Sequence, residues 1–201
     1  MAVPSLRVAA SNPRARRCSV VLVGLLWGCT SGNGPDAQNE ARRALAAAPE
    51  PVLMTLLGNP FEMDQARLNA LVSNELARGV TGMSTEFTTA AERAAAPEPH
   101  LVVVLNPANE PEPATLCAAP EIVPTAPADE QVQILAAFCR GDQVLNTART
   151  EAVVGGPTDQ RFRRLLWRTS SALFPDDYAE TYGFGILPRW LDFGLGGSFG
   201  L

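Results

Sequence analysis

The sequence predicts an α+β protein, a two-layer sandwich in which two amphipathic helices cover one face of a four-stranded, mainly antiparallel sheet. Residues 59–79 and 158–173 carry apolar side chains at helical spacing, and residues 131–149 alternate with period two around a turn. With the strand-like segment 100–106, whose residues 101–105 are all apolar, these segments supply enough apolar surface for one core within residues 51–175.

The first helix is predicted between Asn59 and Gly79. Asn59 suits the N-cap, Pro60 the first helical position and Gly79 the end of the helix. Glu62 follows the cap by three residues, as in a capping box. One apolar stripe must face the core, formed by Leu68, Leu71, Val72 and Leu76.

Two strands are expected next. Residues 83–87 alternate in polarity, which favours a strand, and residues 100–106 (HLVVVLN) are typical of a strand buried on both faces. The short apolar run 52–57 does not indicate whether it is a helix or a strand. The alanine-rich residues 36–48 can form a short helix.

Residues 107–129 contain six prolines, which predicts a long loop without a helix or a central strand. From residue 131 apolar positions alternate again on both sides of Gly141-Asp142. Because Gly-Asp favours a tight turn, this segment is predicted to be a β-hairpin.

The last helix is predicted to begin near Thr158 and to end at Phe174-Pro175. Its apolar stripe comprises Phe162, Leu165, Leu166, Thr169 and Leu173. Around the stripe lies a basic face made by Arg161, Arg163, Arg164 and Arg168. This face is either solvated helix surface or a binding surface for an acidic partner.

The N-terminal residues have the order of an export signal. Four arginines and no acid precede the apolar run 20–27, which as a helix spans about 12 Å and is too short to cross a hydrocarbon core of about 30 Å. A buried N-terminal strand is the alternative interpretation.

The sequence Leu26-Trp27-Gly28-Cys29 resembles the lipobox of bacterial lipoproteins, followed by a polar stretch that can act as a tether. The resemblance implies that residues 1–28 are a signal peptide and that Cys29 carries lipid, with residues 29–50 as the tether. It further implies a protein anchored in the cell envelope facing the periplasm, and Thr30 after the cysteine favours the outer membrane over the inner. Residues 51–175 resemble no named family, and an ordinary cleaved signal stays open.

Two cysteines remain after the signal and the lipidated residue, Cys117 and Cys139. In an oxidising compartment they suggest one disulfide. Two unrelated buried thiols are the alternative. A two-ligand metal site is disfavoured because zinc requires three or four ligands.

Charge and motifs exclude several function classes. All 21 acidic residues follow Cys29, whereas four of the 16 arginines precede it, so residues 29–201 carry a formal charge of −9. This argues against nucleic acid as a partner. The single histidine, His100, has no companion for a triad, and no phosphate loop or metal-ligand set is present, so we expect no cofactor, no metal and no enzymatic activity.

Residues 176–201 form an aromatic and glycine-rich tail, in which Trp190 and Phe193 can either cover the core or dock on a partner or at the membrane interface. The leading hypothesis is a lipid-anchored, non-catalytic accessory or protein-interaction module with an envelope partner. Its contact residues are expected to be Arg161, Arg164, Arg168 and the two tail aromatics. The alternative is a domain that binds a small molecule or lipid between sheet and helices.

Overall fold

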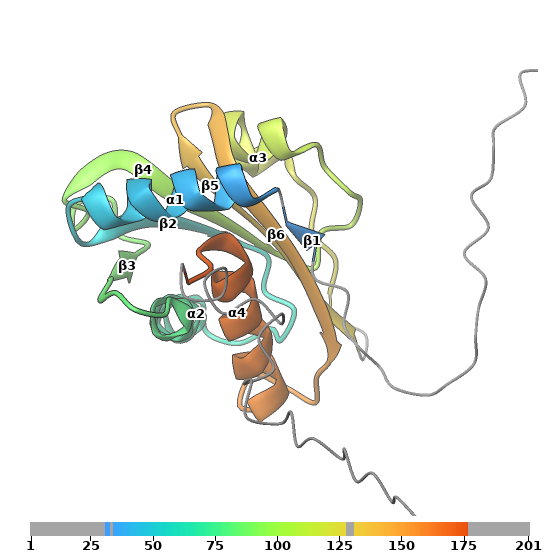
Figure 1. The fold of residues 1–201 in the computed structure, drawn as a ribbon. Coiled ribbons are helices and arrows are strands. Elements are labelled where there is room, and N and C mark those ends of the chain that lie inside the picture. Colours follow the sequence, from blue (N-terminus) through green and yellow to red (C-terminus); the bar gives the residue numbers. More distant parts are fainter. Residues whose placement is uncertain (1–30, 33, 128–130, 177–201) are drawn as a thin grey trace, which may run out of the picture.

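The computed structural model describes residues 31–32, 34–127 and 131–176. In chain order its elements are β1 (Ser31–Gly32), α1 (Pro35–Ala47), β2 (Val52–Leu57), α2 (Gln65–Gly79), β3 (Phe87–Thr88), β4 (Ala96–Leu105), α3 (Pro113–Ala118), the 3-10 turn η1 (Pro120–Ile122), β5 (Gln131–Arg140), β6 (Gln143–Val153) and α4 (Gln160–Leu173). The predicted α+β class is confirmed, and Figure 1 shows the helices packed around one twisted sheet.

The sheet is mixed and has six strands in the order β1-β6-β5-β4-β2-β3, not four. β4, β5 and β6 pair antiparallel, whereas β2 runs parallel to both β4 and β3. The undecided run 52–57 is therefore a strand inside the sheet. Its parallel partner β3 follows after the helix α2, since parallel neighbours require a crossover connection.

The hairpin prediction is confirmed. β5 and β6 are joined by Gly141 and Asp142, and Gly141 adopts φ +55°, a left-handed conformation that glycine takes without steric cost. Alternate residues of β5 enter the main core: Val132, Ile134, Ala136 and Phe138.

Helices cover both faces of the sheet, unequally. α1, α2 and α4 pack on one face and enclose the main core. On the opposite face, α3 and η1 enclose a smaller core around Val102, Val104 and Ala137. The predicted two-layer sandwich thus acquires a partial third layer.

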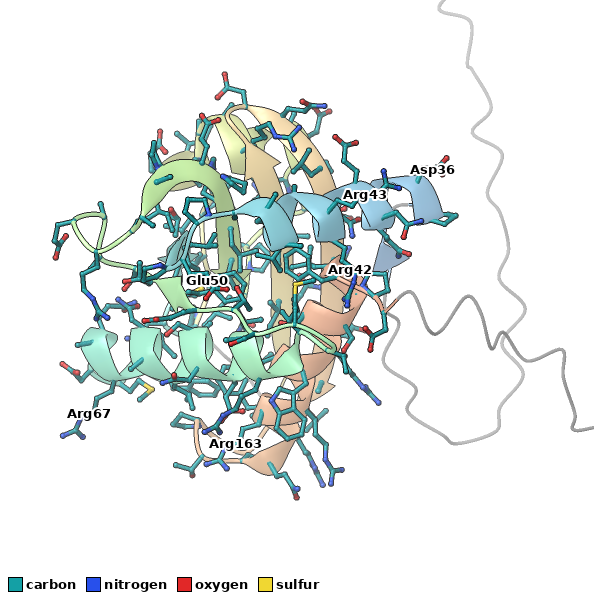
Figure 2. All side chains as sticks on the ribbon, turned by 60° about the vertical axis from the view of Figure 1, so that its left-hand side comes forward. Asp36, Arg42, Arg43, Glu50, Arg67 and Arg163 are labelled. Atoms are coloured by element: carbon teal, nitrogen blue, oxygen red, sulfur yellow. A yellow bond between two sulfur atoms is a disulfide. The ribbon has the colours of Figure 1, made fainter. Side chains whose placement is uncertain are left out.

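The segment expected to be a tether, 29–50, contains a packed helix. Ala41, Ala44 and Leu45 of α1 are buried against the main core. Arg42 on the same helix donates to the carbonyl of Phe174 at 3.2 Å and to Asp176 Oδ1 at 2.8 Å, so α1 is tied to the end of α4 (Figure 2). The folded part therefore extends N-terminal to residue 51.

Three predicted boundaries differ from the structure. α2 begins at Gln65 with Asp64 as its N-cap, while Asn59 instead closes a turn by accepting from the Met63 amide. The alternating run 83–87 yields only the two-residue β3. The proline-rich segment does contain a helix, α3, because Pro113 occupies its first turn, where no backbone donor is needed.

α2 and α4 approach closely at Gly79. A Cβ atom built there would lie 2.8 Å from the Trp167 Cα, so only glycine permits this contact. Ser170 Oγ donates to the Leu76 carbonyl at 2.6 Å in the same region. The end of α2 thus holds α4 in a defined position on the sheet.

Candidate functional site

α4 presents the predicted arginine face. Asp159 caps the helix: its Oδ1 accepts from the Arg161 amide at 2.9 Å and its Oδ2 from the Gly155 amide at 2.9 Å. These two backbone hydrogen bonds, and then the Arg161 charge, hold the pKa of Asp159 below its ordinary value. The predicted apolar stripe is buried in full, comprising Phe162, Leu165, Leu166, Thr169 and Leu173.

Burial of the stripe turns Arg161, Arg164 and Arg168 outward, and all three are exposed. In the part of the chain that the structure describes, Arg164 and Arg168 form no salt bridge. Six other arginines do: Arg42, Arg78, Arg93, Arg140, Arg149 and Arg163. On the outer face of α4, Arg164 and Arg168 therefore carry positive charges that form no salt bridge with a described carboxylate.

Trp167 lies beside these arginines and is held by a buried carboxylate. Glu75 of α2 is only 4% exposed, and its Oε2 accepts from the Trp167 indole N–H at 2.9 Å. Its Oε1 lies 3.3 Å from Arg78 Nη1 and 3.9 Å from Arg163 Nε. Figure 2 shows Arg163 near the lower end of α4, below α2.

This arrangement positions a large aromatic surface in solvent. Trp167 is 39% exposed, although its indole N–H donates a hydrogen bond to the buried Glu75. The exposed part is therefore the carbon surface of the indole ring. We define the arginine–tryptophan face as Arg161, Arg164, Trp167 and Arg168. It combines tryptophan and arginine, two of the three residue types that are enriched at binding hot spots.

Sequence reasoning identified the three arginines but missed Glu75 and Trp167. Glu75 falls between Val72 and Leu76 on the apolar stripe of α2, and an acid in that position was the available signal that it has a buried partner. The local sequence around Glu75 cannot identify this partner, because Trp167 lies 92 residues further along the chain.

The two cysteines expected to pair do lie together. Cys117 in α3 and Cys139 in β5 form a disulfide with a Cα–Cα distance of 5.7 Å. Both side chains are buried in the smaller core, so the bond fixes α3 to the sheet. Its position indicates a structural role.

His100 lies in β4 and pairs in register with Cys139. Burial lowers its pKa, an effect opposed by the charges of Glu98 and Asp142. His100 is thus a half-buried residue of β4 whose pKa responds to its burial and to the charges of Glu98 and Asp142.

Other predicted site residues lie outside the described ranges: Cys29, Trp190 and Phe193. Within residues 31–32, 34–127 and 131–176, no three side chains of His, Cys, Asp or Glu are grouped as metal ligands. Over the same ranges no helix has the length and apolarity needed to span a bilayer.

The hollows on the described surface include a pair away from α4. One, of about 340 Å³, lies between the start of α3 and strands β5 and β6, where Arg149 and Glu110 form an ion pair. The other, of about 420 Å³, lies between α2 and β3. Neither belongs to the arginine–tryptophan face.

Comparisons with known proteins leave the family open. No family model matches the chain, and no curated protein matches it. Among solved structures, the PelC dodecamer from Paraburkholderia phytofirmans is similar, with 12% identity, a TM-score of 0.38, and coverage of 73% of this chain and 98% of that chain. A likeness of this size establishes neither a common family nor a common function.

Proposed function

We propose that the chain is a non-catalytic, lipid-anchored interaction module of the cell envelope, and that its arginine–tryptophan face binds an acidic surface of a partner protein. The observation that carries the proposal is the fixed, exposed indole of Trp167 beside Arg164 and Arg168, which have no described ion-pair partner. Trp190 and Phe193 of the tail are proposed as further contacts.

Preorganisation supports this role. Binding costs less when side chains are already held in their bound position, and Glu75 holds the Trp167 indole by a hydrogen bond from a buried site. The exposed guanidinium groups would steer an acidic partner toward the face and pair with its carboxylates. Because the described residues contain 16 acids and 11 arginines, this basic face is also a local exception on an acidic domain.

The test of the face is a charge reversal with a matched control. We expect Arg164→Glu with Arg168→Glu to lower the affinity for the partner about tenfold, and Trp167→Ala to lower it roughly 30-fold, which corresponds to about 2 kcal/mol. The partner is first trapped in living cells through a photo-crosslinking residue at position 161, and the affinity is then measured with the purified pair.

The control is Arg43→Glu with Arg67→Glu. These two arginines are also exposed and form no salt bridge with any described residue, but they lie on α1 and α2. The control variant makes the same change in net charge and should bind normally. Equal loss of binding in both double variants would reject the face as the site, since it would indicate a general effect of net charge.

The anchor has its own test. We expect the intact mass of the membrane-extracted protein to correspond to a chain that begins at Cys29 and carries acyl chains on that residue. More than one chain is expected, because a single chain gives only marginal membrane binding. A protein that retains residues 1–28, or one that begins at an unmodified residue, would contradict the lipid anchor while leaving the face to be judged by its own experiment.

A further inference from the structure

The sheet begins very close to the residue proposed to carry lipid. Ser31 and Gly32 form β1, the first strand in the sheet order, and pair antiparallel with Arg149 and Ala148 of β6 (Figure 1). Cys29 precedes Ser31 by two residues. In any conformation two residues span at most about 7 Å, so the attachment point lies within that distance of the sheet. A domain attached so closely cannot stand off the membrane on a tether.

The direction of β1 selects one end of the domain. Because β1 and β6 are antiparallel, the N-terminal end of β1 points toward Val153, the last residue of β6. Val153 follows Arg149 by four residues, which is about 13 Å along the strand. In the other direction the hairpin turn at Asp142 lies seven residues from Arg149, or roughly 23 Å. We define residues 152–158 as the anchor end and the turn around Asp142 as the hairpin end.

The anchor end has the composition of a surface that can lie against lipid headgroups. Residues 152–158 contain no charged side chain, and Val153 is 45% exposed. The next residue, Asp159, accepts hydrogen bonds from the backbone amides of Gly155 and Arg161. Contact of this end with a membrane therefore buries apolar surface and requires little desolvation of charge.

The hairpin end is charged instead. Arg140 and Asp142 are exposed at the turn, and the Glu98 carboxylate lies 3.3 Å from the Cβ position of Gly141. Arg140 also lies 3.6 Å from Glu40 of α1. Contact of this end with headgroups would desolvate these charges, and anionic lipids would repel its carboxylates. Chain length and surface chemistry thus favour the same end for the membrane.

We propose that the anchor end of the domain lies directly against the phospholipid surface, with β6 running from that surface toward the hairpin end. The proposal rests on the lipid anchor at Cys29 proposed above and deepens it, because it assigns the surface of the domain that the lipid holds against the membrane.

The orientation also places the arginine–tryptophan face. α4 begins at Gln160, two residues after the anchor end, and returns along β6, so that the carbonyl of its last residue, Leu173, accepts from Asn146 at 2.8 Å. Arg161 therefore lies near the membrane, and Arg168 lies about 10 Å further along the helix axis. A partner that binds this face must present its acidic surface close to the same membrane.

The test places a fluorescent amino acid at either end of the acylated full-length protein. It replaces Val153 at the anchor end or Asp142 at the hairpin end, both of which are exposed. The protein is reconstituted in vesicles of phosphatidylethanolamine and phosphatidylglycerol that contain a lipid spin-labelled at its headgroup, which quenches nearby fluorophores. The two positions lie 11 residues apart, roughly 36 Å along the strand, so we expect quenching at position 153 to be at least about threefold that at position 142.

A matched variant supplies the missing tether. Insertion of about 15 glycine and serine residues between Thr30 and Ser31 adds roughly 20 Å of mean reach. This variant should keep its acyl chains and its attachment to the vesicles, but quenching at position 153 should fall to the level at position 142. Equal quenching at both positions of the natural chain, stronger quenching at position 142, or no effect of the insertion would overturn the proposal.

The intact mass of the same preparation separates this orientation from the anchor itself. A chain without acyl groups would reject both the anchor and the orientation that rests on it. An acylated chain with equal quenching at the two ends would reject the orientation alone and leave the anchor in place.

Discussion

Replacing Phe138 by alanine is expected to lower the free energy of unfolding by about 3–5 kcal/mol. Phe138 lies in β5 at the centre of the sheet, is 0% exposed, and meets the ring of Phe174 edge-on with 5.0 Å between ring centroids. Alanine would leave a cavity between the sheet and the end of α4, and rigid neighbouring strands can fill it only in part. The measurement is equilibrium unfolding in urea.

Ile122→Ala is the matched control for this variant. Ile122 is also a large apolar residue, but its side chain is 66% exposed and it lies in η1. Truncation there removes little buried surface and should change the unfolding free energy by less than about 0.5 kcal/mol. If Phe138→Ala lowers the free energy of unfolding by no more than Ile122→Ala does, the packing between β5 and α4 does not contribute substantially to stability.

Local patterns in the sequence were sufficient to predict some elements. The β5–β6 hairpin follows from period-two alternation around Gly141-Asp142, and α4 follows from an apolar stripe at helical spacing that ends at Phe174-Pro175. Both signals lie within about 20 residues, so no knowledge of distant contacts is needed. The exposure of Arg161, Arg164 and Arg168 follows in turn from burial of the stripe on the other side of α4.

The remaining architecture depends on pairing between distant segments. Nothing local to residues 52–57 states that β2 inserts beside β4 in a parallel orientation, and the packing of α1 depends on Arg42 reaching Phe174 and Asp176. The contact between Glu75 and Trp167 is of the same kind. These features become visible only when both partners are placed in space.

The proline-rich segment shows a different reason why a prediction from the sequence was wrong. Six prolines in residues 107–129 correctly exclude a long helix, but they do not exclude a helix of one or two turns that begins at a proline. α3 is such a helix, and it is Cys117 within it that meets Cys139 in β5. A short helix with few buried side chains, Leu116 and Cys117, depends on this covalent link more than a long one would.

Removing the disulfide by Cys117→Ala with Cys139→Ala is therefore expected to lower the free energy of unfolding by about 3 kcal/mol. The bond joins residues 22 positions apart and so restricts the unfolded chain. It also holds α3 and η1 on a face that no other described helix covers. Unfolding in urea with and without dithiothreitol measures the effect.

The reductant provides the internal control. Dithiothreitol should destabilise the natural chain by nearly as much as the double substitution does, and it should leave the double variant unchanged. Hydrogen exchange then separates a local effect from a global one: backbone amides of residues 115–123 should lose protection first, while those of Ile134 to Phe138 in the main core should keep theirs under native conditions. If the natural chain is equally stable in reductant, or if β5 and α3 lose protection together, the disulfide does not act as a clamp on this smaller layer.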